Sequence, residues 1–167
     1  MTIANILTLL RLAAVPLFVY LFSLEGIDPR WIALIFVLTG ITDVLDGRLA
    51  RSRNEVTRFG TLVDPLADKL MVLAAVFSLA ARGGVPRWVA LLLAAKELAL
   101  IAGAGFFLVS KSKVTPASNV GKLATVLLYI GITGIIIGVS EMLYVVILGV
   151  AVSLLAGLGY LLQALGK

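Results

Sequence analysis

The 167-residue sequence contains neither cysteine nor histidine, and it has few charged residues. Without cysteine the chain can form no disulfide bond and no thiolate metal site, although this absence indicates no particular compartment. Without histidine, imidazole is excluded as a metal ligand and as a general base, so acid–base chemistry must come from carboxylates, lysine or tyrosine. Charged residues make up 14% of the chain, against about 25% in ordinary soluble domains.

Apolar residues dominate the composition, at 61% of the chain with a mean hydropathy of +1.12. A soluble domain of this length could not bury so much apolar surface. The composition therefore predicts an integral membrane protein, and the length predicts a single domain over residues 1–167. The net charge of +5 fits contact with anionic lipid headgroups or phosphorylated substrates. The usual excess of Lys and Arg on the cytoplasmic side of membrane proteins explains it equally well.

Several apolar stretches are long enough to cross a bilayer, which takes about 20 mainly apolar residues per helix. We predict an all-α protein with six transmembrane helices, at approximately 5–23, 31–49, 61–81, 87–110, 118–138 and 142–165. One side of these spans is flanked by Arg48, Arg51, Arg53, Arg58, Lys111, Lys113, Lys122 and Lys167. The other side has only Arg30, Arg82 and Arg87. Because cytoplasmic loops carry the excess of Lys and Arg, we predict that both termini are cytoplasmic.

Four aspartates lie at the predicted cytoplasmic ends of the second and third spans, where ionisable groups are costly and usually functional. Asp43 and Asp46 are three residues apart and Asp64 and Asp68 are four apart, so each pair shares one helix face. Two antiparallel helices could aim all four into one pocket, where uncompensated carboxylates would repel and take up protons. Oxygen ligands without His or Cys favour Mg²⁺, Mn²⁺ or Ca²⁺ over Zn²⁺. Such a pocket could hold one ion or two.

The residues between the two aspartate pairs suit a ligand that carries phosphate. Gly47 and Gly60 leave room for a ligand close to the backbone, and Ala50 keeps the surface shallow. Arg51 can donate a bidentate pair of hydrogen bonds to a phosphate. Other charges in this segment are typical of a solvated or headgroup-facing loop, namely Arg48, Arg53, Glu55 and Arg58.

Together these positions read Asp43-x2-Asp46-Gly47-x2-Ala50-Arg51-x8-Gly60-x3-Asp64-x3-Asp68, which resembles the complete signature of the CDP-alcohol phosphotransferases. The resemblance implies an enzyme in which an alcohol hydroxyl attacks the β-phosphate of CDP-diacylglycerol and releases CMP. The four aspartates would bind two divalent cations, Mg²⁺ or Mn²⁺, and Asp68 would also accept the proton of the attacking hydroxyl. Gly47, Ala50, Arg51 and Gly60 would hold the cytidine diphosphate portion.

The resemblance also implies a multi-pass protein of the cell membrane, in contact with membrane lipids and forming a homodimer. Combined with the predicted orientation, it places the active site at the cytoplasmic face. We predict no nucleic-acid partner for such an enzyme.

The alcohol acceptor is indicated by weaker similarities. The opening Ile3-Ala4-Asn5-Ile6-Leu7-Thr8-Leu9-Leu10-Arg11 is similar to the start of bacterial phosphatidylglycerolphosphate synthases and related cardiolipin synthases, which usually have Pro in place of Ala4. Lys96-Glu97 stands where the former group typically has Arg-Glu, but a second Arg further along is missing. Ala124 replaces the second Lys of the Gly-Lys-x-Lys-Thr segment of that group.

We predict glycerol 3-phosphate as the acceptor, with Lys96 and Lys122 binding its phosphate and Ser118 and Thr125 as candidate hydroxyl donors. Simpler interpretations stay open: an internal ion pair for Lys96 and Glu97, and a cytoplasmic anchor for Lys122. Lys69 directly follows Asp68 and could balance the charge of the site, although it must point to a different helix face. Within the family, phosphatidylglycerol as the acceptor of a cardiolipin synthase is the first alternative, because a lipid acceptor needs fewer phosphate-binding cations. Inositol phosphate and serine follow.

Two functions outside this family fit the residues less well. A cation or proton transporter also places carboxylates within spans, but near the midplane and often with an internal repeat. The aspartates of this chain instead cluster at the predicted cytoplasmic ends of two spans, and the motif is not repeated in the sequence. A purely structural membrane protein would have no need for the complete signature.

Overall fold

The computed structural model of the chain describes the backbone of residues 3–52, 58–109 and 119–165, and the side chains of residues 9–42, 69–100 and 119–159. Helices account for nearly all of the described residues, and no strand occurs among them. In chain order these helices are α1 (Ile3–Ser23), α2 (Pro29–Ser52), α3 (Arg58–Ala81), α4 (Arg87–Val109), α5 (Asn119–Ile136) and α6 (Met142–Leu165). The prediction of an all-α chain is therefore confirmed for the described residues, and each predicted span coincides with one helix to within a few residues.

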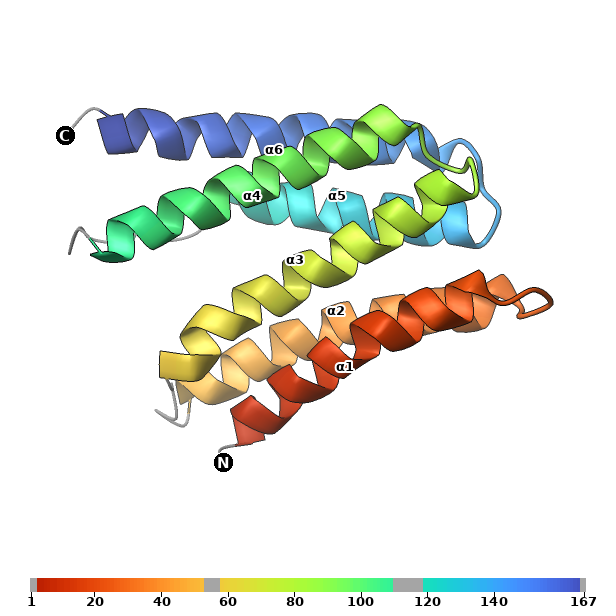
Figure 1. Cartoon of the computed structure of the whole chain (residues 1–167), viewed down its shortest axis with the longest axis horizontal. Coiled ribbons are helices and arrows are strands. Elements are labelled where there is room, and N and C mark those ends of the chain that lie inside the picture. The colour runs from red at the N-terminus through yellow and green to blue at the C-terminus, as the bar shows by residue number, and fades with distance from the viewer. Residues whose placement is uncertain (1–2, 53–57, 110–118, 166–167) are drawn as a thin grey trace.

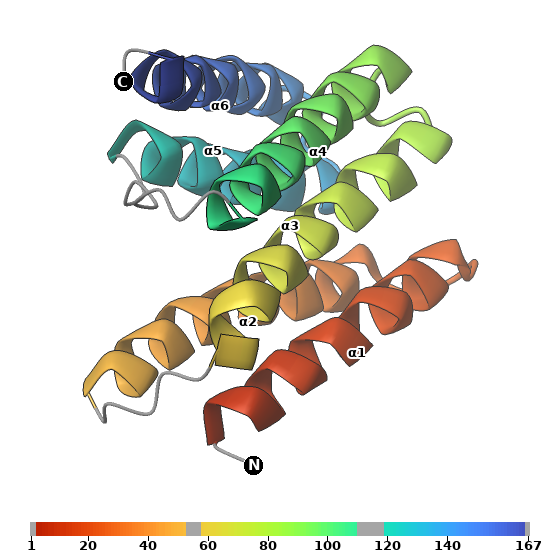
Figure 2. The same cartoon turned by 60° about the vertical axis from the view of Figure 1, so that its left-hand side comes forward.

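Successive helices run in opposite directions (Figure 1). The helices α1, α3 and α5 begin at one end of the bundle, where α2, α4 and α6 end, and we call this the aspartate end. The opposite end, which we call the turn end, holds the short connections α1–α2, α3–α4 and α5–α6 (Figures 1 and 2). The first turn of α1 and the last turn of α6 thus lie at the same end, as the orientation prediction requires.

The turn end is built from strong helix stop and start signals. The backbone of Gly83 and Gly138 has φ of 78° and 95°, a left-handed conformation that glycine adopts at little cost and that commonly ends a helix. Past α3, the Gly84 N–H donates to the Leu79 carbonyl at 2.9 Å, and past α5 the Val139 N–H donates to the Gly134 carbonyl at 2.9 Å. At the start of α2, a side-chain oxygen of Asp28 accepts the Arg30 N–H at 2.9 Å, which caps the helix.

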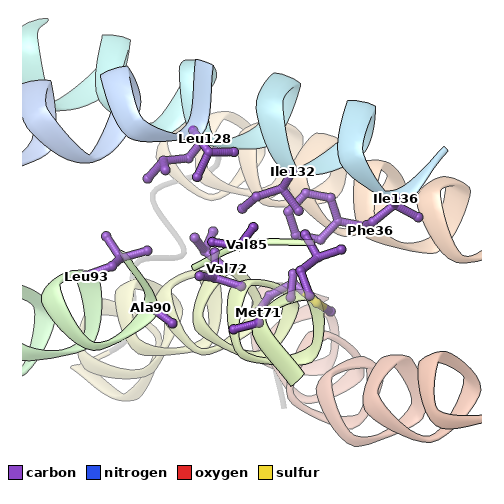
Figure 3. Close-up of a cluster of buried hydrophobic side chains, with 14 of the residues drawn as sticks. Phe36, Met71, Val72, Val85, Ala90, Leu93, Leu128, Ile132 and Ile136 are labelled. Carbon is purple, nitrogen blue, oxygen red and sulfur yellow. The ribbon is translucent and has the colours of Figure 1, made fainter. Parts of the chain in front are cut away.

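Buried apolar side chains from all six described helices meet in one core. Figure 3 shows Leu128, Ile132 and Ile136 of α5 facing Met71 and Val72 of α3, with Leu93 of α4 beside them. Phe36 of α2 closes this core and stacks on Tyr129 of α5, with ring centroids 4.7 Å apart. On the other side of α3, α1 packs against both α2 and α3.

Small residues allow the closest helix approaches. An added Cβ on Gly131 of α5 would lie 2.7 Å from Val146 Cγ2 and 2.9 Å from the Val146 backbone nitrogen on α6. An added Cβ on Gly40 of α2 would lie 2.4 Å from Cε1 of Tyr129 on α5. Such contacts are how helices associate in membranes, where lipid removes the hydrophobic advantage of burial. The α5–α6 pair and the α2–α5 crossing therefore depend on these glycines.

Two helices in the described residues are long and apolar enough to cross a membrane, Asn119–Ile136 and Met142–Gly159. The described apolar parts of α1, α2 and α3 are shorter. Large apolar side chains nevertheless face outward on several helices, including Leu98 of α4 and Leu155 of α6, which are 64% and 63% exposed. Contiguous exposed apolar surface marks a contact with lipid or protein. These features support a membrane protein, while six spans stay a prediction.

Candidate functional site

The two predicted aspartate pairs lie on two helices that contact each other. Asp43 and Asp46 are in the C-terminal half of α2, and Asp64 and Asp68 are in the N-terminal half of α3. These halves approach the same end of the bundle (Figures 1 and 2). The side chains of residues 43–68 lie outside the part of the chain that the structure describes. The four metal ligands, and the role of Asp68 as a base, therefore stay predictions.

The helical register connects both aspartate pairs to buried stripes. On α2, Phe36 and Thr39 are buried, and Asp43 and Asp46 follow Thr39 at spacings of four and seven residues. On α3, Met71, Val72 and Ala75 are buried, and Asp68 precedes the first two by three and four residues. Asp64 lies one turn further back. Because residues three, four and seven apart share a helix face, this register predicts that the aspartates continue the stripes that face the bundle interior.

The remaining positions of the motif occupy the helix ends beside these aspartates. Gly47, Ala50 and Arg51 lie in the last turns of α2, and Gly60 lies in the first turn of α3. The assignment of these residues to the cytidine diphosphate portion falls on side chains outside the described residues, and it stays a prediction.

Helix α1 contributes a buried cation to the same group of helices. Arg11 is 4% exposed and precedes the buried Phe18 by seven residues, on one face of α1. That helix packs against α2 and α3, which carry the aspartates. A charge inside an apolar bundle is tolerated when it is paired. At this location a site carboxylate or a lipid phosphate would be a suitable partner for Arg11.

A partly buried ion cluster joins α3 to α4. Lys69 Nζ donates to Glu97 Oε2, and Lys96 Nζ donates to Glu97 Oε1 at 2.5 Å. The side chains of Glu97 and Lys96 are 9% and 12% exposed, and that of Lys69 is 30% exposed. The Lys96–Glu97 ion pair anticipated as the simpler interpretation is present. The bond from Lys69 was not predicted, because it depends on which face of α3 meets α4.

The other acceptor-binding candidates lie on α5 or just before it. Lys122 is exposed in the first turn of α5, and the Thr125 hydroxyl donates to the Gly121 carbonyl at 3.2 Å. Ser118 lies outside the described residues. Within the described residues α4 packs against α3 and α6, and α5 packs against α2, α3 and α6. Lys96 and Lys122 thus stand on helices that do not adjoin there, and their shared role in binding an acceptor stays a prediction.

The chain is similar to known proteins over most of its length. Residues 1–157 match the family model for CDP-alcohol phosphatidyltransferase. A Rickettsia bellii protein named CDP-diacylglycerol–glycerol-3-phosphate 3-phosphatidyltransferase is 35% identical over 148 residues, covering 87% of this chain and 81% of its own. A probable phosphatidylglycerophosphate synthase of Mycobacterium tuberculosis is 37% identical over 172 residues, covering 98% and 81%.

A third relative carries a different acceptor in its name. The cardiolipin synthase (CMP-forming) of Streptomyces coelicolor is 38% identical over 129 residues, covering 75% of this chain but only 60% of its own length. The family-model match, residues 1–157, includes both helices that bear the aspartate motif. On this evidence, the chain belongs to the CDP-alcohol phosphatidyltransferase family.

Proposed function

We propose that this protein transfers the phosphatidyl group of CDP-diacylglycerol to glycerol 3-phosphate, releasing CMP and forming phosphatidylglycerol phosphate. The observation that carries the proposal is similarity over most of both chains to enzymes named for this acceptor, at 35% and 37% identity. The complete aspartate motif on two adjoining helices supplies the matching chemistry. The protein would thus act in phospholipid biosynthesis.

The donor set of this chain fits two divalent cations, Mg²⁺ or Mn²⁺. Four carboxylates in one pair of helices, in a chain without His or Cys, provide the hard oxygen ligands that these ions prefer. Asp43, Asp46, Asp64 and Asp68 would hold the ions. When bound, the ions neutralise charge on the diphosphate and on the attacking and leaving oxygens. Among the side chains that the structure describes, no other group of three acidic residues, His or Cys could do so.

The residues of the chain would orient the two substrates. Asp68 would accept the proton of the acceptor hydroxyl as that oxygen bonds to the β-phosphorus and the bond to CMP breaks. Arg51 would bind the diphosphate in bidentate fashion. The ammonium group of Lys96 would attract the phosphate of the acceptor. The cluster of Lys69, Lys96 and Glu97 has a net positive charge, because one carboxylate pairs with two ammonium groups. Catalysis of phosphoryl transfer depends mainly on positioning the reactants and stabilising the charge of the transition state.

The orientation in the membrane is supported by aromatic residues at the turn end. Tyr20, Trp31, Trp88 and Tyr144 are 55–77% exposed and lie within about one turn of that end of α1, α2, α4 and α6. Exposed Trp and Tyr at a common level mark the boundary between lipid tails and water. We propose six spans, with the turn end at the outer boundary and the aspartate end facing the cytoplasm. CDP-diacylglycerol would then stay in the bilayer while its headgroup meets a soluble acceptor.

The two tryptophans allow this arrangement to be measured, because the chain has no others. In vesicles containing brominated phospholipids, we expect bromines near the headgroup to quench tryptophan fluorescence more strongly than bromines near the chain terminus. A matched control replaces both tryptophans by Phe and adds Leu98→Trp, at an exposed site in the middle of α4. That variant should show the reverse preference. Deep quenching of the native tryptophans would contradict the proposed boundary.

The acceptor is tested by CMP release from purified protein in detergent with CDP-diacylglycerol and Mg²⁺ or Mn²⁺. We expect release with glycerol 3-phosphate and little with phosphatidylglycerol, inositol 1-phosphate or serine. The product mass identifies which acceptor received the phosphatidyl group. Release only with phosphatidylglycerol would replace this proposal by the alternative below. No release with any acceptor, from folded protein that binds the CDP-lipid, would overturn the proposed reaction for these alcohols.

Cardiolipin synthesis is the second candidate, favoured by the Streptomyces relative and by one feature of the chain. Ala124 is buried on α5 where a second Lys is expected for a phosphorylated acceptor. A site with fewer cations suits phosphatidylglycerol, whose attacking hydroxyl is on a lipid. The smaller coverage of that relative, 60% of its length, places this candidate second.

A homodimer stays a proposal from the family resemblance, and sedimentation in detergent would measure it.

A further inference from the structure

The carboxylate of Glu97 binds two lysines that come from different helices. Lys69 reaches it from α3, whereas Lys96 is its direct neighbour on α4. Glu97 itself is 6% exposed. Both carboxylate oxygens are therefore used, one for the bond between helices and one for a bond within α4.

A contribution to the stability of the fold does not by itself explain this ion cluster. Desolvating an ion pair can cost as much as the attraction returns, and apolar residues of similar size often serve equally well. The sequence already places apolar residues on both stripes. Lys69 precedes the buried Val72 and Val76 by three and seven residues, and Glu97 follows Leu93 and Ala90 by four and seven. The ion pair thus occupies the next turn of two buried apolar stripes, in the direction of the aspartate end.

Lys69 directly follows Asp68, so a bond at Lys69 acts on the part of α3 that carries the aspartates. The same stretch of α3 contains Pro65, between Asp64 and Asp68. Proline has no N–H, so this stretch lacks the backbone hydrogen bond to residue 61 and is less restrained than an ordinary helix. A tertiary bond at Lys69 restrains it from outside, by fixing the rotation of α3 against α4.

We propose that Glu97 is a positioning residue, which holds Asp64 and Asp68 in place by binding Lys69 across the α3–α4 contact. The inference rests on the proposed function, in which these aspartates bind divalent cations. Glu97 touches neither substrate nor metal in this role. It acts through Lys69 on the setting of the helix that carries two of the four ligands.

The two lysines provide a matched pair of variants. Lys69→Met and Lys96→Met each remove one ammonium from Glu97, leave it one lysine, and change the local charge by the same amount. Of the two lysine bonds to Glu97, only the one removed by Lys69→Met links α3 to α4. On charge alone, losing a nearby cation would tighten binding of a divalent ion in either variant. A loss of affinity confined to Lys69→Met is therefore a signature of positioning.

The probe is Mn²⁺ alone, titrated into purified full-length protein in lipid nanodiscs and followed by electron paramagnetic resonance of the free ion. No lipid substrate or acceptor is present, so the proposed acceptor role of Lys96 does not enter. Residues that orient metal ligands typically contribute 10–100-fold to metal affinity. We expect Lys69→Met and Glu97→Gln to weaken Mn²⁺ binding about tenfold or more. The Mn²⁺ affinity of Lys96→Met should stay within about twofold of wild type. Lys69→Arg should retain most of the wild-type affinity, because an arginine at this position can still reach Glu97.

Each variant is first checked for a monodisperse elution profile and a cooperative thermal transition. Lys69→Arg and Glu97→Gln keep side-chain volume, so they carry the test if a Met variant does not fold. Equal Mn²⁺ affinity in Lys69→Met, Lys96→Met and wild type would overturn the positioning role and leave the proposed function intact. A wild-type protein that binds no Mn²⁺ would instead overturn the proposed metal site, and this inference with it.

Discussion

Asp68→Asn is expected to abolish CMP release, by about 10³-fold or more relative to wild type. The substitution keeps the size of the side chain but removes its negative charge and its capacity to accept a proton. In the proposed reaction it therefore removes one metal ligand and the base in a single step. The measurement is CMP formation from CDP-diacylglycerol and glycerol 3-phosphate at saturating Mg²⁺, over a range of enzyme concentrations wide enough to detect residual activity.

The stability of the metal-free protein separates this effect from misfolding. Four clustered carboxylates repel one another, so removing one should leave the Tm of the metal-free protein unchanged or raise it. Adding Mg²⁺ should raise the Tm of wild type, because a ligand that binds only the folded state stabilises it, and should raise the variant less. Glu141→Gln is the matched control, since Glu141 is an exposed carboxylate at the turn end. Substantial CMP release by Asp68→Asn would refute its assigned role.

Gly131→Ala is expected to destabilise the pairing of α5 and α6 by about 1–3 kcal/mol. The new Cβ would lie 2.9 Å from the backbone nitrogen of Val146 and 3.3 Å from the Met142 carbonyl oxygen. Backbone atoms cannot rotate away as a side chain can, so the two helices must separate. Much of the close packing between them, which includes Gly134 against Met142 and Gly149 against Leu128, would loosen as well.

The control for this substitution is Gly157→Ala on α6. A Cβ at Gly157 meets no atom of the described residues within 4 Å, and alanine favours the helix by up to about 1 kcal/mol over glycine. Denaturation of both variants in mixed micelles, followed by circular dichroism, should therefore move in opposite directions from wild type. Equal stability of Gly131→Ala and wild type would mean that α5 and α6 do not approach as closely as described.

The amino-acid sequence was sufficient for the features that depend on one segment at a time. A membrane helix must satisfy its backbone internally, so each apolar stretch of about 20 residues forms a helix whatever its neighbours. For this reason the predicted ranges agree with α1 to α6 within a few residues. The motif from Asp43 to Asp68 likewise indicated the family, because its eight residues and their spacing are local properties of two helices and one connection.

The features that depend on contacts between helices needed the tertiary structure. Lys96 and Glu97 are neighbours in sequence, so their ion pair could be anticipated, but the bond from Lys69 requires that one face of α3 meets one face of α4. The fit of Gly40 against Tyr129 similarly requires that α2 crosses α5.

Apolar periodicity indicates that a helix has a buried face, but lipid-facing and protein-facing surfaces are both apolar in a membrane protein. The sequence therefore determined which residues form the helices, and it predicts which of them carry the chemistry. Which helix each face packs against was decided only by close packing across the bundle. There, small residues, aromatic rings and one buried carboxylate contact residues of neighbouring helices.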